Sequence, residues 1–234
     1  MSRLLVINPN TSESVTERLH ACIQAALPDV DVCAATARFG APYISSETSY
    51  AVAGHAVLDA WADSCSRHRE SPDAVLIGCF GDPGLFALRE CCSARVTGLA
   101  EAAFLEAAAV GRFAVVTGGD AWGPILKRFA RTMDLGDALL GVHTVAPTGA
   151  QLAAKPAMAL ELLTQACRDA SERWPCDAII LGGATLAGLA VTIQPKINVP
   201  MIDSVLAGAR FALNAPLGAG TAINFRIGIE TRLS

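Results

Sequence analysis

The residue best suited to chemistry is a cysteine that occurs in only one of two similar segments. Residues 73–85 align with residues 177–189 without a gap, and each copy reads as an apolar strand, a glycine turn and the start of a helix. The first turn carries Cys79, whereas the second has Gly183 at the matching position. A thiol between a buried strand and a helix N-terminus is expected to have a lowered pKa, which favours the thiolate. The pattern predicts an enzyme built on one cysteine acid/base.

The residues around this thiol have less specific roles. Asp82 and Pro83 follow Cys79 and are typical of an N-cap and a first helical position. We therefore expect the Asp82 carboxylate to cap the helix that follows the turn. Most of the other cysteines are expected to be buried apolar residues, and the four histidines are scattered along the chain.

Polar turns elsewhere in the chain supply candidate substrate contacts. In parallel sheets, ligands bind beyond the carboxyl ends of the strands. This rule selects the turns at 8–12, 79–82, 117–120 and 183–185, and the polar loop 40–50 is long enough to fold over them. The same residue types also form ordinary turns and caps. The predicted substrate-binding residues in these segments are Asn8, Ser46, Thr117, Gly118, Gly183 and Thr185.

Strands that alternate with helices are needed to position these turns. Apolar runs predict strands, and helical periodicity predicts helices between them, as in parallel α/β sheets. The expected strands lie at 4–7, 30–34, 74–78, 113–117, 139–145 and 178–181, with a further candidate at 223–229. The expected helices include 15–26, 51–65, 123–132 and 156–173. We predict an α/β fold of two similar lobes, residues 1–95 with about 205–234 and residues 96–204, with the active site in the cleft between them.

Composition excludes several classes of protein. The chain has 234 residues, 52% of them hydrophobic, which is ample for a core. Its net charge of -4 argues against nucleic acid as a partner. No signal peptide or membrane span is expected, which favours a cytoplasmic protein with reduced thiols. The cysteines form no C-x-x-C pair and the first strand has no G-x-G-x-x-G after it, so neither a zinc site nor a dinucleotide site is predicted.

Four motifs together resemble the aspartate/glutamate racemase superfamily, and within it the hydantoin and allantoin racemase branch. These motifs are residues 6–12, 78–84, 177–183 and 199–203. The resemblance covers nearly the whole chain and implies a cofactor-independent isomerase, a racemase or epimerase that forms a homo-oligomer. In that family two cysteines, one in each lobe, flank a carbon acid next to a carbonyl. The first would be Cys79, and the residues after each cysteine position, Phe80 and Ala184, would contact substrate.

The chain departs from this family pattern at Gly183, where the second cysteine is expected. Three functions therefore stay open for a small substrate that carries a carbonyl or a carboxylate. The first is a racemase or epimerase whose second base is another group. The second is a single-cysteine decarboxylase or isomerase that resembles arylmalonate decarboxylase. The third is a binding protein without catalytic activity.

Overall fold

Two parallel sheets of four strands each form the framework of the protein. The computed structural model describes residues 1–67 and 71–214. The first sheet has the order β2-β1-β3-β4 and the second the order β6-β5-β7-β8. The strands are β1 (Arg3–Asn8), β2 (Asp31–Thr36), β3 (Ala74–Ile77), β4 (Arg95–Gly98), β5 (Phe113–Gly118), β6 (Leu139–Val145), β7 (Ala178–Gly182) and β8 (Met201–Asp203). The predicted α/β fold of two similar lobes is confirmed.

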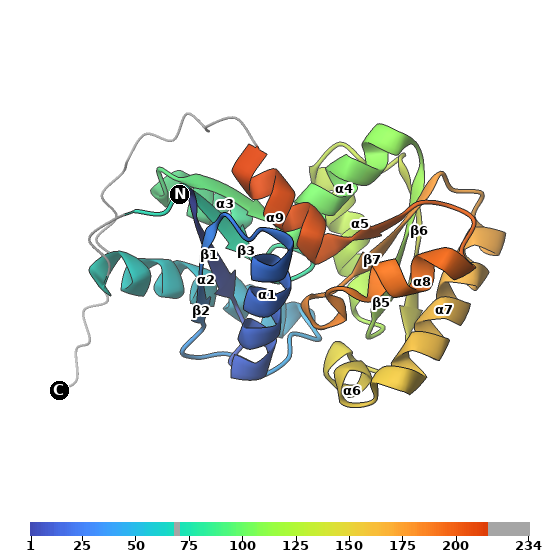
Figure 1. The fold of residues 1–234 in the computed structure, drawn as a ribbon, viewed down its shortest axis with the longest axis horizontal. Helices are drawn as coiled ribbons and strands as arrows, with labels where there is room; N and C mark the ends of the chain where they lie inside the picture. The colour runs from blue at the N-terminus through green and yellow to red at the C-terminus, as the bar shows by residue number, and fades with distance from the viewer. Residues whose placement is uncertain (68–70, 215–234) are drawn as a thin grey trace.

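Helices cover both sheets, and the two lobes lie side by side in Figure 1. The helices are α1 (Glu13–Ala26), α2 (Glu47–Arg67), α3 (Leu85–Cys91), α4 (Leu99–Val110), α5 (Trp122–Thr132), α6 (Gly149–Ala154), α7 (Pro156–Arg173), α8 (Leu189–Ile193) and α9 (Ser204–Asn214). Two short 3₁₀ helices follow β7, at Ala184–Leu186 and Gln194–Lys196. The predicted helix at 51–65 is longer than expected, since α2 begins at Glu47.

Strands β3 and β7 are apolar along their whole length because helices cover both faces of each sheet. All four residues of β3 and all five of β7 are buried. Strand β1 pairs in parallel with β3, with Leu4 opposite Ala74 and Ile7 opposite Ile77. Strand β5 pairs with β7 in the same way, with Phe113 opposite Ala178. The carboxyl ends of the four central strands therefore carry the turns that the sequence selects as a site.

A shared apolar core joins the two lobes. Phe104 of α4 lies 5.3 Å from Phe113 of β5 and 6.0 Å from both Phe80 and Phe129, measured between ring centroids. Phe104 and Phe113 are fully buried. Because these rings come from both halves of the chain, their packing fixes the position of one lobe against the other.

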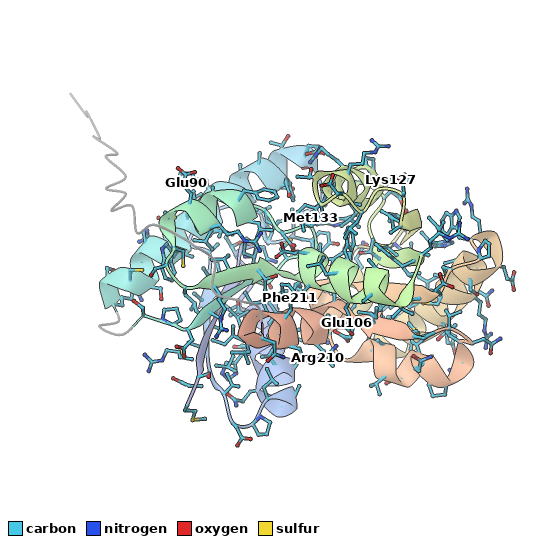
Figure 2. All side chains as sticks on the ribbon, turned by 90° about the horizontal axis from the view of Figure 1, so that it is seen from above. Glu90, Glu106, Lys127, Met133, Arg210 and Phe211 are labelled. Atoms are coloured by element: carbon cyan, nitrogen blue, oxygen red, sulfur yellow. The ribbon has the colours of Figure 1, made fainter. Side chains whose placement is uncertain are left out.

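Helix α9 also connects the lobes. It contacts α1, β3 and β4 on one side and α4 on the other, and Figure 1 shows it, in red, between the two sheets. Figure 2 shows Glu106 of α4 beside Arg210 of α9, and the two side chains form an ion pair of 2.9 Å. The predicted lobe boundary between residues 95 and 96 falls inside β4, which pairs with β3 of the first sheet. The candidate strand at 223–229 lies outside the described residues.

Among the residues that the structure describes, no helix combines the length and the apolar character that a bilayer requires. The same residues contain no group of three or more histidine, cysteine, aspartate or glutamate side chains arranged to hold a metal ion.

Candidate active site

A pocket lies between the lobes, at the carboxyl ends of the central strands. Its enclosed volume is about 40 Å³, and the space between its walls comes to about 450 Å³ when the open mouth is counted. The residues that line it are Asn10, Val15, Tyr43, Ile44, Gly78, Cys79, Phe80, Thr117, Gly118, Trp122, Gly149, Gly182, Gly183, Ala184, Thr185 and Leu186. Both of the repeated glycine turns contribute to this lining, so the duplicated segments face one common space.

Cys79 lies one residue beyond Gly78 at the end of β3 and lines the pocket. It is buried, with 7% of its surface exposed. Burial raises the pKa of the Cys79 thiol, and the charge of Asp82 raises it further. The predicted lowering of this pKa is therefore wrong. Helix α3 begins only at Leu85, too far along the chain for its N-terminus to stabilise the thiolate, because such effects act within the first turn. Burial and Asp82 therefore both favour the protonated thiol over the thiolate.

Asp82 also differs from the sequence-based expectation. Its carboxylate accepts hydrogen bonds from the backbone N–H groups of Ala100 at 2.9 Å and Glu101 at 2.7 Å, so it caps α4 and not the helix that follows it. Helix α3 starts instead after Gly84, which has a left-handed backbone with φ +79°. Burial raises the pKa of Asp82 to about 7. The carboxylate contacts Gly98, where a side chain of any size would collide with it.

The second turn has no side chain at the matching position. Gly183 has φ +141°, a conformation that residues with a Cβ rarely adopt. A Cβ there would meet Leu186 at 3.4 Å and the Thr117 hydroxyl at 4.0 Å, which is ordinary contact. The backbone N–H of Gly183 donates to the Ser204 hydroxyl at 3.1 Å. The space would admit a Cβ, but the backbone of this turn is shaped for glycine.

Most of the predicted site residues meet in this pocket. The structure brings together Cys79, Phe80, Thr117, Gly118, Gly183, Ala184 and Thr185, and it places Asn8 and Ser46 outside the lining. The amide N–H₂ of Asn8 donates to Asn10 and Thr16 at 3.0 Å each, so Asn8 orders the loop that presents Asn10. Ser46 is exposed and bonds with Ser49 at the start of α2.

The sequence predictions missed Tyr43, Trp122 and Gly149. Tyr43 belongs to the polar loop 40–50, in which the sequence predicts Ser46 as the substrate contact. The Tyr43 hydroxyl donates to the Gly118 carbonyl at 3.3 Å and accepts from the Gly149 N–H at 3.0 Å. A large aromatic residue in a loop of small polar residues is a signal that could have identified it, because aromatic side chains provide most of the apolar contact in ligand pockets.

The floor of the pocket depends on close contact between the lobes. The ring of Phe80, from the first lobe, lies so close to Gly182 of the second lobe that a Cβ at Gly182 would overlap it. Thr185 stands in the same relation to Gly149. Small residues at these places let the walls of the pocket approach each other, which limits it to small molecules.

No Lys, Arg, His, Asp or Glu is among the described residues that line the pocket. A separate surface depression does contain charged side chains, those of Asp82 and Arg128. The hydroxyls of Thr117 and Thr185 make no hydrogen bond to any other described residue, although both side chains are buried. The pocket therefore offers one thiol, free hydroxyls and apolar rings, an arrangement suited to proton transfer on an uncharged molecule.

Comparison with known proteins agrees with this geometry. A sequence model of the Asp/Glu/Hydantoin racemase family matches residues 4–212. A hydantoin racemase of Pseudomonas sp. (strain NS671) is 31% identical over 90% of this chain and 84% of its own length. The structure of allantoin racemase from Klebsiella pneumoniae superposes with a TM-score of 0.85, at 31% identity, over 91% of this chain and 86% of that one. Allantoin racemase from Pseudomonas fluorescens gives a TM-score of 0.82 at 27% identity, over 90% and 89%. The chain therefore belongs to the Asp/Glu/Hydantoin racemase family and is an isomerase of the racemase type.

Proposed function

We propose that this enzyme racemises hydantoin-like cyclic amides, such as 5-substituted hydantoins or allantoin, and that Cys79 is its acid/base. The observation that supports this most directly is the position of Cys79, which is the one cysteine of the described residues that lines the pocket. Relatives at about the same level of identity are named hydantoin racemase and allantoin racemase. Neither the decarboxylase nor the binding protein considered from the sequence is favoured by these relatives.

The uncharged lining supports a neutral substrate over a free amino acid. A carboxylate or an ammonium group that leaves water needs a partner of opposite charge, and burial without one is costly. No charged side chain of the described residues lines the pocket. A hydantoin ring instead presents carbonyl and N–H groups, which the hydroxyls of Thr117 and Thr185 can match. Its apolar substituent would pack against Phe80 and Trp122.

The chemistry needs a base that is strong enough for a weak carbon acid. Cys79 as a thiolate removes the proton next to the ring carbonyl, and the carbonyl oxygen takes up the negative charge. Hydroxyl donors at Thr117 and Thr185 stabilise this enolate most when its charge is greatest, which lowers the barrier. Because burial raises the pKa of Cys79, the thiolate is a strong base but is scarce at neutral pH. The rate of racemisation should therefore rise as the pH increases above neutrality.

The proposal is tested by incubating the purified enzyme with single enantiomers of 5-benzylhydantoin, allantoin and glutamate, and with phenylmalonate. Chiral chromatography measures racemisation, and release of carbon dioxide measures decarboxylation. We expect racemisation of a hydantoin or of allantoin, at a rate that dialysis against EDTA leaves unchanged because no cofactor takes part. Release of carbon dioxide from phenylmalonate without racemisation of any hydantoin would contradict the proposal.

We also expect the enzyme to be a homo-oligomer, as the family resemblance implies. Light scattering coupled to size-exclusion chromatography measures the mass of the particle in solution. A mass equal to the 24.3 kDa of one chain would contradict this expectation.

A further inference from the structure

The side chains of the pocket include two groups that can carry a proton between reaction steps. Among the described lining residues, these are the thiol of Cys79 and the phenol of Tyr43. Their ordinary pKa values are about 8.5 and about 10, whereas threonine hydroxyls, asparagine amides and indoles do not ionise in this range. A racemase must handle a proton on both faces of one carbon, and Gly183 offers no group. Tyr43 is the remaining candidate.

The backbone of Tyr43 belongs to the first lobe, but its hydroxyl oxygen lies against the second lobe. The residue belongs to the loop between β2 and α2. Its hydroxyl bonds to Gly118 at the end of β5 and to Gly149 at the start of α6, both in the second lobe. Gly149 in turn contacts Thr185, two residues beyond Gly183. The phenol oxygen therefore belongs to the wall of the second lobe, while Cys79 belongs to the wall of the first.

The surroundings of the Tyr43 oxygen suit both of its protonation states. The backbone N–H of Gly149 donates to it, and this bond stabilises a phenolate, while the nearby indole of Trp122 also acts to lower the pKa of Tyr43. The Gly118 carbonyl accepts from the hydroxyl, which stabilises the phenol. Burial outweighs these groups and raises the pKa of Tyr43, which favours the phenol, the form with a proton to give.

We propose that Tyr43 is the acid/base of the second lobe and acts on the substrate face opposite Cys79, in the place that Gly183 leaves without a side chain. In one direction the Cys79 thiolate takes the proton from the substrate carbon and becomes a thiol. The Tyr43 phenol then gives its proton to the other face of the same carbon and becomes a phenolate. In the other direction the phenolate takes the proton and the thiol returns one. One proton is removed and one is added in each turnover.

This inference rests on the proposed racemase function and predicts a separation of two measurable events. In deuterium oxide, removal of the substrate proton by Cys79 alone exchanges it for deuterium with retention of configuration. Racemisation requires both groups. The variant Tyr43→Phe removes the hydroxyl and keeps the ring, so it should lower racemisation of 5-benzylhydantoin by about 10²–10⁴-fold. Exchange with retention should persist for the enantiomer whose proton faces Cys79.

Tyr50→Phe is a matched control, since Tyr50 is the other tyrosine of the chain and follows the same loop. Its hydroxyl bonds to the Gly81 carbonyl at 2.6 Å, and Tyr50 does not line the pocket. Racemisation by Tyr50→Phe should stay within about threefold of the wild type. Thermal unfolding of both variants establishes that they are folded.

The outcomes separate this inference from the proposed function. If exchange and racemisation both persist in Tyr43→Phe, the role of Tyr43 is overturned and the proposed function still stands. Equal loss of both events in a folded Tyr43→Phe variant would also overturn it, because Tyr43 would then only hold the lobes together. A wild-type enzyme that neither exchanges nor racemises any hydantoin or allantoin would overturn the proposed function, and this inference with it.

Discussion

The turn after β3 and the turn after β7 share one backbone plan but differ in the groups they carry. Both leave a buried strand through a glycine, and both start a helix after a left-handed glycine, Gly84 with φ +79° and Gly188 with φ +81°. The first turn carries the thiol of Cys79. The second carries Gly183, with φ +141°. The duplication thus preserved the frame of the site while the chemistry diverged between its halves.

The supports behind the two turns have diverged as well. In the first lobe, Asp82 of the turn reaches out to cap α4. In the second lobe, Asp203 at the end of β8 caps its own helix, α9, through Val205 at 2.9 Å, and also accepts from the N–H of Gly188 in the turn at 2.7 Å. In both lobes a carboxylate joins the turn to the helix that follows the last strand of the sheet, α4 or α9, but the carboxylate belongs to the turn in the first lobe and to the last strand in the second. The difference between the lobes therefore extends beyond one missing thiol.

Among the variants that compare the two turns, the largest effect is expected when the thiol is moved from one turn to the other. In the double variant Cys79→Gly with Gly183→Cys, the thiol would stand in the same wall as Tyr43. The wall of the first lobe would then carry no acid/base, so one face of the substrate would have no group to transfer its proton. Racemisation should therefore fall by at least about 10²-fold. Chiral chromatography of 5-benzylhydantoin measures this loss. Wild-type rates in the double variant would show that the two turns are interchangeable, contrary to the comparison.

The free energy of unfolding is expected to change by several kcal/mol with pH, because of Asp82 in the first turn. Burial raises the pKa of Asp82 to about 7, compared with about 3.9 for an unfolded aspartate. Between these values the folded state binds a proton that the unfolded state does not. The free energy of unfolding should therefore fall as the pH rises from about 4 to about 7.

Asp82→Asn should flatten this slope, because the group that titrates is removed. Urea unfolding at pH 5 and pH 7.5 measures it. Burial also raises the pKa of Asp203, so Asp203→Asn is a parallel variant for the second lobe, with a change in the same direction. A slope in Asp82→Asn as steep as that of the wild type would contradict this account of the first turn.

A smaller effect concerns the backbone of the second turn. Gly183→Ala should lower the free energy of unfolding by about 1–2 kcal/mol, because a Cβ is strained at φ +141°. Gly188→Ala is the matched control: its φ is +81° and nothing lies within 4 Å of an added Cβ, so only the backbone term remains. Similar losses in the two variants are expected from urea unfolding. A neutral Gly183→Ala would mean that this turn can accept a side chain without strain.

The smallest effect is expected from an ion pair between the lobes. Arg128 of α5 binds Glu47 at the start of α2 through two hydrogen bonds, but both side chains are more than half exposed. Glu47→Gln should lower the free energy of unfolding only slightly, because both groups are exposed to water, and 1 M salt should remove the difference. A large loss of stability that persists in 1 M salt would show that this pair, rather than the aromatic core, holds the lobes together.

Strong local signals made much of the fold predictable. The runs at 74–78 and 178–181 are apolar without a break, which predicts central strands, and β3 and β7 are indeed fully buried. The repeat of these runs predicts two lobes. The same repeat leads to Cys79 and Gly183. The pKa of Cys79 could not be predicted, because it depends on how deeply the turn is buried and on where α3 begins.

The features that the sequence did not predict, the roles of several side chains at the site, depend on contacts between segments far apart in the sequence. Asp82 was expected to cap the next helix, but the fold brings the N-terminus of α4 to its carboxylate from 18 residues away. Tyr43 reaches Gly149 across 106 residues, and no local pattern encodes that contact. Asn8 was expected at the substrate because it ends a central strand, yet its amide is used to order the neighbouring loop.

The central claim, that Cys79 exchanges the substrate proton, is tested most directly by the rate of deuterium incorporation at the reacting carbon of 5-benzylhydantoin in deuterium oxide. For the enantiomer whose proton faces Cys79, Cys79→Ala should incorporate deuterium at least about 10³-fold more slowly than the wild type. Cys65→Ala, which removes an exposed thiol outside the pocket, should leave the rate unchanged. Deuterium incorporation by Cys79→Ala at the rate of Cys65→Ala would contradict the claim.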